Sequence, residues 1–244
     1  MLLSVENLRK TISGTPVLQG IDLEIEKGNV VAIIGPSGSG KTTLLRCLNF
    51  LEKADGGRLT FAGETFDLAK ISRNNVLRIR KRTGFVFQNY NLFLNKTALE
   101  NITEGLIVGR GIKKELAQAK AHELLARFSL THRENAYPCE LSGGQQQRVA
   151  IARALAGDPD IIYFDEPTSA LDPELTRDVL SILKELAQQG LTMVVVTHEL
   201  TFAKNVANKV VFMEAGHVVE AGDAQTIFGN PKELRTKEFL ETLT

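Results

Sequence analysis

The feature that most constrains this chain is a short apolar run that leads into a Gly-rich segment and then a helical pattern. Val30–Ile34 is typical of a strand buried on both faces of a parallel sheet. A helical stretch runs from Lys41 to about Leu51. The segment between them matches the pattern G-x-x-x-x-G-K-[ST] and consists of Gly35, Pro36, Ser37, Gly38, Ser39, Gly40, Lys41 and Thr42, with Thr43 next.

The chemistry of this segment favours phosphate binding. Its glycines let backbone N–H groups surround phosphates at the positive end of the following helix. Lys41 is expected to reach the β- and γ-phosphates of a nucleotide, and the Thr42 hydroxyl is expected to face Mg²⁺. The alternative is a simple Gly/Ser turn, but the position between a buried strand and a helix argues against it.

Further strand and helix patterns place this unit in an α/β fold. Ile161–Phe164 and Met193–Val196 resemble the first apolar run. Between them, Pro173–Gln188 has a helical pattern, with Asp172 as its N-cap and Gly190 just beyond its end. Alternation of strands and helices predicts a parallel sheet that is covered by helices.

Two regions differ from this core. The stretch 89–156 is mostly helical in pattern and is predicted to form a helical subdomain. The ends, 2–66 and 209–220, carry strand and turn signals that suggest an antiparallel β flap. We therefore expect a single domain over 1–244, with the core and flap at about 1–88 and 157–244.

Composition excludes some classes of protein. Formal net charge is zero, with 29 basic and 29 acidic residues, whereas a sequence-independent nucleic-acid binder usually has a basic excess. The two cysteines do not make a disulfide framework, which favours a reducing cytosol. The start of the chain lacks the pattern of a signal peptide, and no apolar run approaches the ~18 residues that span a bilayer.

Acidic residues follow the strand predicted at Ile161–Phe164. Ligands of open α/β sheets bind beyond the carboxyl ends of strands, which is where Asp165 and Glu166 fall. Asp165 is a candidate Mg²⁺ ligand, and Glu166 is a candidate general base for an attacking water. An Asp-Glu pair after a strand is by itself more often part of a solvated turn. Because this chain also has a phosphate loop, we favour a role for both residues in the nucleotide site.

A second candidate anion site lies at Leu141–Gln145. Ser142, Gly143, Gly144 and Gln145 open a helical pattern, so they could bind phosphate or form an ordinary Ser N-cap. With this LSGGQ segment the chain resembles the ABC-transporter ATPase family over essentially its whole length. The phosphate loop matches the Walker A motif and Ile161–Asp165 the Walker B strand. The remaining matches are Gln88 (Q-loop), Ser169–Asp172 (D-loop) and His198 (switch histidine).

The resemblance implies an ABC ATPase fold, ATP and Mg²⁺ as ligands, and a homodimer with ATP sandwiched between each phosphate loop and the partner's signature segment. It also implies that His198 contacts the γ-phosphate and that Gln88 contacts Mg²⁺ or the nucleophilic water. Ile12 stands where family members often carry an adenine-stacking aromatic residue, and Ser13 stands where Gly is usual, so we expect modest nucleotide affinity.

Within the family, several segments resemble the polar amino-acid importers of the glutamine or cystine type; they are Phe85–Phe93, Ala98–Asn101, Tyr137-Pro138, Gln145–Arg148 and Arg235–Leu240. This implies transmembrane permease subunits, an extracellular or periplasmic amino-acid-binding protein, no nucleic-acid partner, and a peripheral position on the cytoplasmic side of the cell membrane. The alternatives are an ABC exporter or lipid-release ATPase, a soluble ABC ATPase that acts on nucleic acid or ribosomes, and a P-loop kinase. The kinase leaves Leu141–Gln145 and His198 unexplained.

Overall fold

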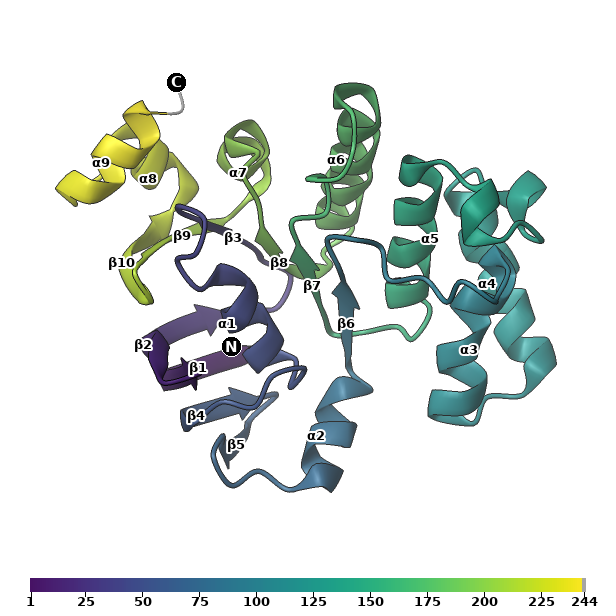
Figure 1. Ribbon diagram of the computed structural model, residues 1–244, viewed down its shortest axis with the longest axis horizontal. Helices are drawn as coiled ribbons and strands as arrows, with labels where there is room; N and C mark the ends of the chain where they lie inside the picture. The colour runs from purple at the N-terminus through teal and green to yellow at the C-terminus, as the bar shows by residue number, and fades with distance from the viewer. Residues whose placement is uncertain (243–244) are drawn as a thin grey trace. The chain divides into compact units, whose positions relative to one another are not determined.

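The computed structural model describes residues 1–242 and divides into two compact units. The first unit comprises Met1–Arg80 and Leu186–Thr244, and the second comprises Lys81–Glu185. Figure 1 labels the elements of both. The helical subdomain predicted at 89–156 lies within the second unit, and its boundaries stay a prediction.

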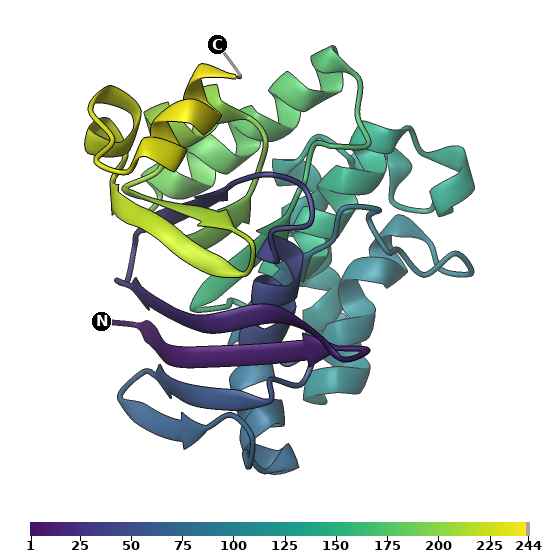
Figure 2. The same ribbon diagram turned by 60° about the vertical axis from the view of Figure 1, so that its left-hand side comes forward.

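The first unit contains an antiparallel sheet of order β2-β1-β4-β5, which Figure 2 shows in purple and blue. Its strands are β1 (Leu3–Ile12), β2 (Thr15–Ile25), β4 (Gly56–Phe61) and β5 (Glu64–Asp67). Alternating burial along β2, with Ile21, Leu23 and Ile25 at most 3% exposed, gives this sheet one apolar face. This part of the predicted β flap has the expected antiparallel pairing.

The flap prediction for the C-terminal strands is wrong. β9 (Lys209–Glu214) pairs in parallel with β3 (Val30–Ile34), which also pairs in parallel with β8 (Thr192–Val196). β10 (His217–Asp223) adds an antiparallel edge to β9. The reason is burial: the four residues from Val210 to Met213 are fully buried, as in a central strand of a parallel sheet.

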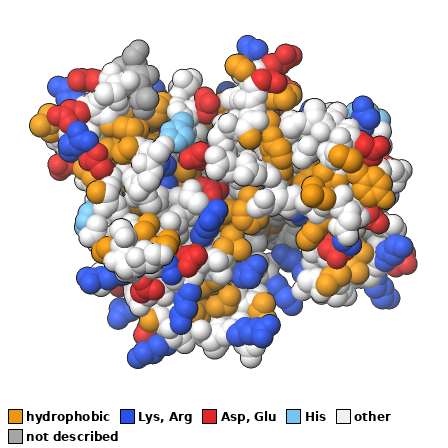
Figure 3. All heavy atoms as spheres, in the orientation of Figure 1, with side chains coloured by type: hydrophobic (Ala, Val, Ile, Leu, Met, Phe, Trp, Pro, Cys, Tyr) orange, Lys and Arg blue, Asp and Glu red, His pale blue; other side chains and the backbone are white. Residues whose placement is uncertain are grey.

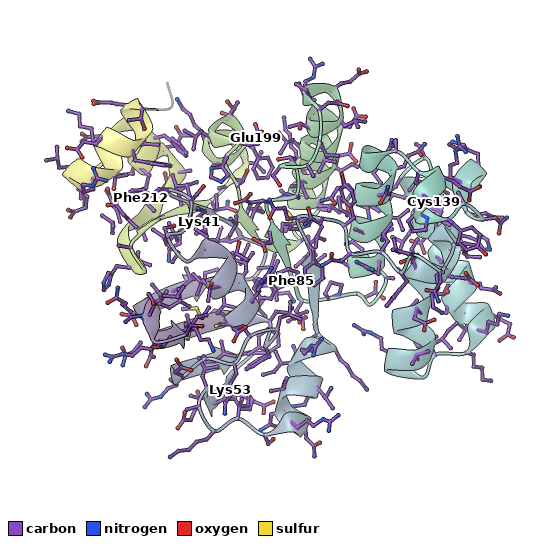
Figure 4. The ribbon with its side chains drawn as sticks, in the orientation of Figure 1. Lys41, Lys53, Phe85, Cys139, Glu199 and Phe212 are labelled. Carbon is purple, nitrogen blue, oxygen red and sulfur yellow. The ribbon has the colours of Figure 1, made fainter. Side chains whose placement is uncertain are left out.

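The first unit also contains helices. They are α1 (Lys41–Leu48), α2 (Arg73–Arg80), α7 (Leu200–Val206), α8 (Ala224–Gly229) and α9 (Leu234–Glu241). One apolar cluster joins β3 and β9 to α7 and α8, with Phe239 of α9 packed against it. Phe212, labelled in Figure 4, stacks on Phe239 with ring centroids 5.0 Å apart. Burial of these side chains holds the C-terminal helices on the sheet.

The second unit pairs β6 (Thr83–Val86) in parallel with β7 (Ile161–Asp165). Its helical elements are α3 (Ala98–Arg110), α4 (Lys114–Arg127), the short 3-10 helices Thr131–Arg133 and Pro138–Glu140, α5 (Gly143–Leu155) and most of α6 (Pro173–Gln188). α3 begins at a capping box in which Thr97 and Glu100 exchange hydrogen bonds. Two hydrogen bonds to the Asp172 carboxylate cap α6, as its sequence predicts.

The surface of the first unit carries many basic side chains over α2, β4 and β5 (Figure 3). Arg78 is one of them; it forms an ion pair of 2.5 Å with Glu64, and its guanidinium lies 5.9 Å from the Phe66 ring centroid. Exposed pairs of this kind are typical of a solvated face. Within residues 1–242, none of the helices has the length and apolar character needed to cross a bilayer.

Candidate functional site

Glycines shape the phosphate loop that joins β3 to α1. Gly35 has a φ of +143°, and a Cβ placed there would lie 2.0 Å from the Met213 carbonyl oxygen on β9. Gly40 has a φ of +98°, and its Cβ would lie 2.9 Å from the Val17 carbonyl oxygen on β2. Because both neighbours are backbone, no side chain fits at either position.

Lys41 is buried at the first position of α1 (Figure 4), where it is 5% exposed. Its ammonium donates to the carbonyl oxygens of Gly35 and Pro36, at 2.8 Å each. The Ser39 hydroxyl is buried and has no hydrogen-bond partner within the described chain. A buried cation, an unsatisfied hydroxyl and a loop of glycines at a helix N-terminus fit a phosphate ligand.

His198 follows the strand next to β3 and is exposed. β3 and β8 are parallel neighbours with Ile33 opposite Val196, and the Thr197 N–H donates to the Ile33 carbonyl oxygen at 3.3 Å. His198 and the phosphate loop therefore leave the sheet at the same edge, beyond the carboxyl ends of adjacent strands.

Ile12 ends β1 in the hairpin that leads to Val17, the residue in close contact with Gly40. It is paired with Thr15, and Ser13 and Gly14 form the turn with φ values of 50° and 81°. The Ile12 side chain is 42% exposed. The structure thus connects Ile12 to the phosphate loop through β2, and its contact with adenine stays a prediction.

The acidic residues belong to the second unit. Asp165 ends β7 and is 2% exposed, while Glu166 follows it with a left-handed φ of 47°. The Gln88 amide donates to the Glu166 carboxylate at 3.3 Å. The structure therefore brings the two predicted catalytic side chains Gln88 and Glu166 together, on loops 78 residues apart in the sequence.

The LSGGQ segment forms the N-terminus of α5. Ser142 is the N-cap, and its hydroxyl accepts from the Gln145 N–H at 3.3 Å while the Gln145 side chain accepts from the Ser142 N–H at 3.0 Å. This capping box shows that the ordinary N-cap interpretation is correct. It does not compete with the anion-site interpretation, because an N-cap hydroxyl that accepts still has its own proton to donate.

Oxygen donors dominate the candidate metal ligands, which are the Thr42 hydroxyl, the Asp165 carboxylate and the Gln88 amide. Such a set suits Mg²⁺, which is bound through few protein ligands plus water and substrate phosphates. In the part of the chain that the structure describes, no group of three or more His, Cys, Asp or Glu side chains is arranged to hold a metal ion by itself. Thr42 lies in the first unit, and Asp165 and Gln88 lie in the second.

Sequence reasoning missed two side chains that hold the loop after Gln88. Asn101 of α3 is fully buried; it accepts from the Phe93 N–H at 2.7 Å and donates to the carbonyls of Phe93, Lys96 and Thr97. Arg153 of α5 donates to the carbonyls of Tyr90 and Asn91. The available signal was a polar residue next to apolar ones in a helical pattern, at Asn101 beside Ile102 and at Arg153 in an Ala-rich run.

Comparison with known proteins agrees with these features. Residues 18–169 match the ABC transporter family. The chain is 53% identical to the L-cystine transport system ATP-binding protein of Escherichia coli, over 98% of this chain and 97% of that protein. It is 49% identical to the glutamine transport ATP-binding protein of the same organism, over 98% and 99%. A dimeric ATP-binding cassette bound to ADP and Pi superposes with a TM-score of 0.81 at 36% identity, over 91% of this chain and 99% of that one.

Proposed function

Because this chain belongs to the ABC transporter family, we propose that it is the ATP-hydrolysing subunit of an importer for a polar amino acid, such as cystine or glutamine. The observation that carries this proposal is identity at about half of the aligned positions, over nearly the whole length of both chains, to ATP-binding subunits of cystine, glutamine and arginine transport.

ATP binding is assigned to the phosphate loop, whose geometry supports it. Gly35 to Thr42, with Thr43, would surround the phosphates with backbone N–H groups. Lys41 would exchange its two carbonyl partners for phosphate oxygens, which are stronger acceptors for an ammonium because the bond is charge-assisted. Mg²⁺ would neutralise phosphate charge, held by Thr42, Asp165 and Gln88.

Hydrolysis is assigned to Glu166 as general base, with Gln88 and His198 as the groups that orient water and γ-phosphate. The Gln88 amide donates to the carboxylate that would take the proton, so it fixes the direction of that carboxylate. His198, at the edge beside the phosphate loop, would donate to the γ-phosphate.

Dimerisation would complete the site. In a symmetric dimer each chain's Ser142, Gly143, Gly144 and Gln145 would face the partner's phosphate loop, with ATP between them. The Ser142 hydroxyl proton and the N–H groups at the start of α5 would bind the γ-phosphate. Loss of that phosphate on hydrolysis would open the dimer and transmit the change to permease subunits, on the cytoplasmic side of the membrane. An amino-acid-binding protein would deliver the substrate from outside.

Uptake measurements test the transport assignment. In cells lacking the gene for this chain, uptake of labelled cystine, glutamine and arginine is measured after the wild-type chain or Lys41→Ala is supplied. We expect the wild-type chain to restore uptake of at least one amino acid and the variant to restore none. Restored export with no change in uptake would contradict the importer assignment.

Glu166→Gln tests the catalytic and dimer assignments together. The amide keeps the shape and removes the base, so turnover should fall by roughly 10²–10⁴. At millimolar ATP the variant should elute as a dimer on size exclusion, and with ADP as a monomer. A variant that binds ATP and still elutes as a monomer would contradict the sandwich arrangement.

A further inference from the structure

The loop that follows Gln88 has an unusual backbone. Tyr90 and Asn91 are consecutive residues with left-handed φ values of 60° and 47°. Tyr disfavours this region and Asn tolerates it better, so the pair in succession is stabilised by the neighbouring groups that hold Tyr90. A backbone bond within the loop contributes, since the Tyr90 N–H donates to the Phe87 carbonyl oxygen at 3.3 Å, and a side chain from another element adds a further constraint.

Arg153, near the C-terminal end of α5, supplies that constraint. Its guanidinium donates to the Asn91 carbonyl oxygen at 2.7 Å and to the Tyr90 carbonyl oxygen at 2.9 Å. Its Cζ atom lies 5.9 Å from the Phe93 ring centroid. Burial lowers the pKa of Arg153 to about 10, so the side chain is still cationic at neutral pH. Planar donors in a fork fit two successive carbonyls in a way that a single ammonium cannot.

The held turn contacts the catalytic loop of the same unit at two points. The Gln88 amide donates to Glu166 at 3.3 Å, and the Tyr90 hydroxyl donates to the Ala170 carbonyl oxygen at 3.4 Å. The same hydroxyl lies against the LSGGQ segment, because a Cβ at Gly143 would be 2.8 Å from it. Because Gln88 is only two residues before Tyr90, a displacement of the Tyr90 backbone would also displace Gln88.

We propose that Arg153 is a positioning residue for hydrolysis: by fixing the carbonyls of Tyr90 and Asn91, it sets where the Gln88 amide meets Glu166. This inference rests on the roles proposed above for Gln88 and Glu166. Arg153 and Ser142 lie on the same helix, so α5 fixes the signature segment at one end and the turn after Gln88 at the other. A shift of this helix would move both parts together.

A double-mutant cycle on the full-length chain tests the inference. ATP turnover, the KM for ATP and the stoichiometry of bound ATP are measured for Arg153→Met, Gln88→Ala and the double variant. For Arg153→Met we expect kcat to fall by up to about 100-fold, the size of effect that a misplacement of about 1 Å can have, with KM and stoichiometry within about twofold of wild type. ATP binding should persist because the phosphate loop lies in the other unit.

The cycle separates positioning from a general loss of stability. If Arg153 acts through Gln88, the double variant is no slower than Gln88→Ala alone, whereas independent effects would multiply. Arg110→Met is the matched control, since Arg110 is also a half-buried arginine that donates to a backbone carbonyl, that of Lys81. We expect it to turn over at the wild-type rate. Arg153→Lys should have an intermediate kcat, and it replaces Arg153→Met in the cycle if the latter does not fold.

Two contrary results have different meanings. If Gln88→Ala slows turnover while Arg153→Met does not, or if their effects multiply, the positioning role of Arg153 is overturned and the proposed function stands. If Gln88→Ala turns over at the wild-type rate, the role proposed for Gln88 fails and the inference fails with it.

Discussion

The phosphate loop and the loop at 88–97 are both irregular segments that follow a buried strand, yet they are shaped in opposite ways. The phosphate loop owes its shape to residues of its own motif: Gly35 and Gly40 allow the close approach of the Met213 and Val17 carbonyls, and Lys41 donates to carbonyls of the same loop. The loop at 88–97 is shaped from outside, by Asn101 and Arg153. The first kind of loop is recognisable in a sequence as a motif, and the second kind is not.

Gly35→Ala should produce the largest effect, because it breaks the phosphate loop at its tightest point. Its Cβ would lie 2.0 Å from the Met213 carbonyl oxygen. We expect destabilisation of about 4 kcal/mol or more and no ATP turnover, as measured by chemical denaturation and phosphate release. Gly38→Ala is the matched comparison, since its φ of +79° is strained but nothing lies within 4 Å. Equal losses in the two variants would show that close contact does not explain the role of Gly35.

Lys41→Ala should come next, because it removes charge from the same loop while leaving its glycines intact. We expect turnover to fall by roughly 10²–10³-fold, as for loss of one preorganised electrostatic group, together with weaker ATP binding. Steady-state kinetics and calorimetric titration measure the two effects. Near-normal turnover would refute the assignment of this loop to ATP.

Asn101→Ala tests the loop at 88–97, because it removes one of the two side chains that hold this loop. Three backbone carbonyls and one N–H lose their buried partner, which should lower the free energy of unfolding by about 2–3 kcal/mol. Affinity for ATP should stay near the wild-type value, since the phosphate loop is shaped by its own residues. Asn135→Ala, which removes only one exposed contact of 3.4 Å with Glu134, serves as the control with little change. A large loss of ATP affinity in Asn101→Ala would show that the two loops are not independent.

Ile12→Tyr should have the smallest effect. If Ile12 contacts adenine, an aromatic ring there should tighten ATP binding by ~1 kcal/mol, the usual range for an aromatic pair. Calorimetric titration with ATP measures this gain. Val108→Tyr is the control, since Val108 is an exposed apolar residue of the second unit. An unchanged affinity for ATP in Ile12→Tyr would mean that the base is held elsewhere.

Local signals explain which elements the sequence predicts correctly. Val30–Ile34 and Pro173–Gln188 have the predicted bounds. For the helix, both ends are encoded nearby: Asp172 caps the start, and after the end Gly190 adopts a φ of +77° while the Leu191 N–H donates to the Leu186 carbonyl. Such signals need no knowledge of the rest of the fold.

Strand pairing and distant side chains were beyond the reach of the sequence. β9 is a short apolar run that suits either a flap or a central strand, and only its position between β3 and β10 decides which. Likewise, Arg153 and the carbonyls that it holds are more than 60 residues apart, with separations of 62 and 63. Residues that act across such distances carry no local pattern. The predicted site therefore contained the motif residues but not Asn101 and Arg153, which hold the loop after Gln88.

The left-handed backbone at Glu166 has a consequence for protein engineering. Residues other than Gly, Asn and Asp are disfavoured at a φ of 47°, at a cost in conformational free energy on the order of 1–3 kcal/mol. A library selected only for heat resistance should therefore enrich Gly or Asn at position 166 and lose turnover as it gains stability. Variants improved in this way would be well folded and catalytically silent, so selection for heat resistance on this scaffold has to be coupled to a screen for turnover.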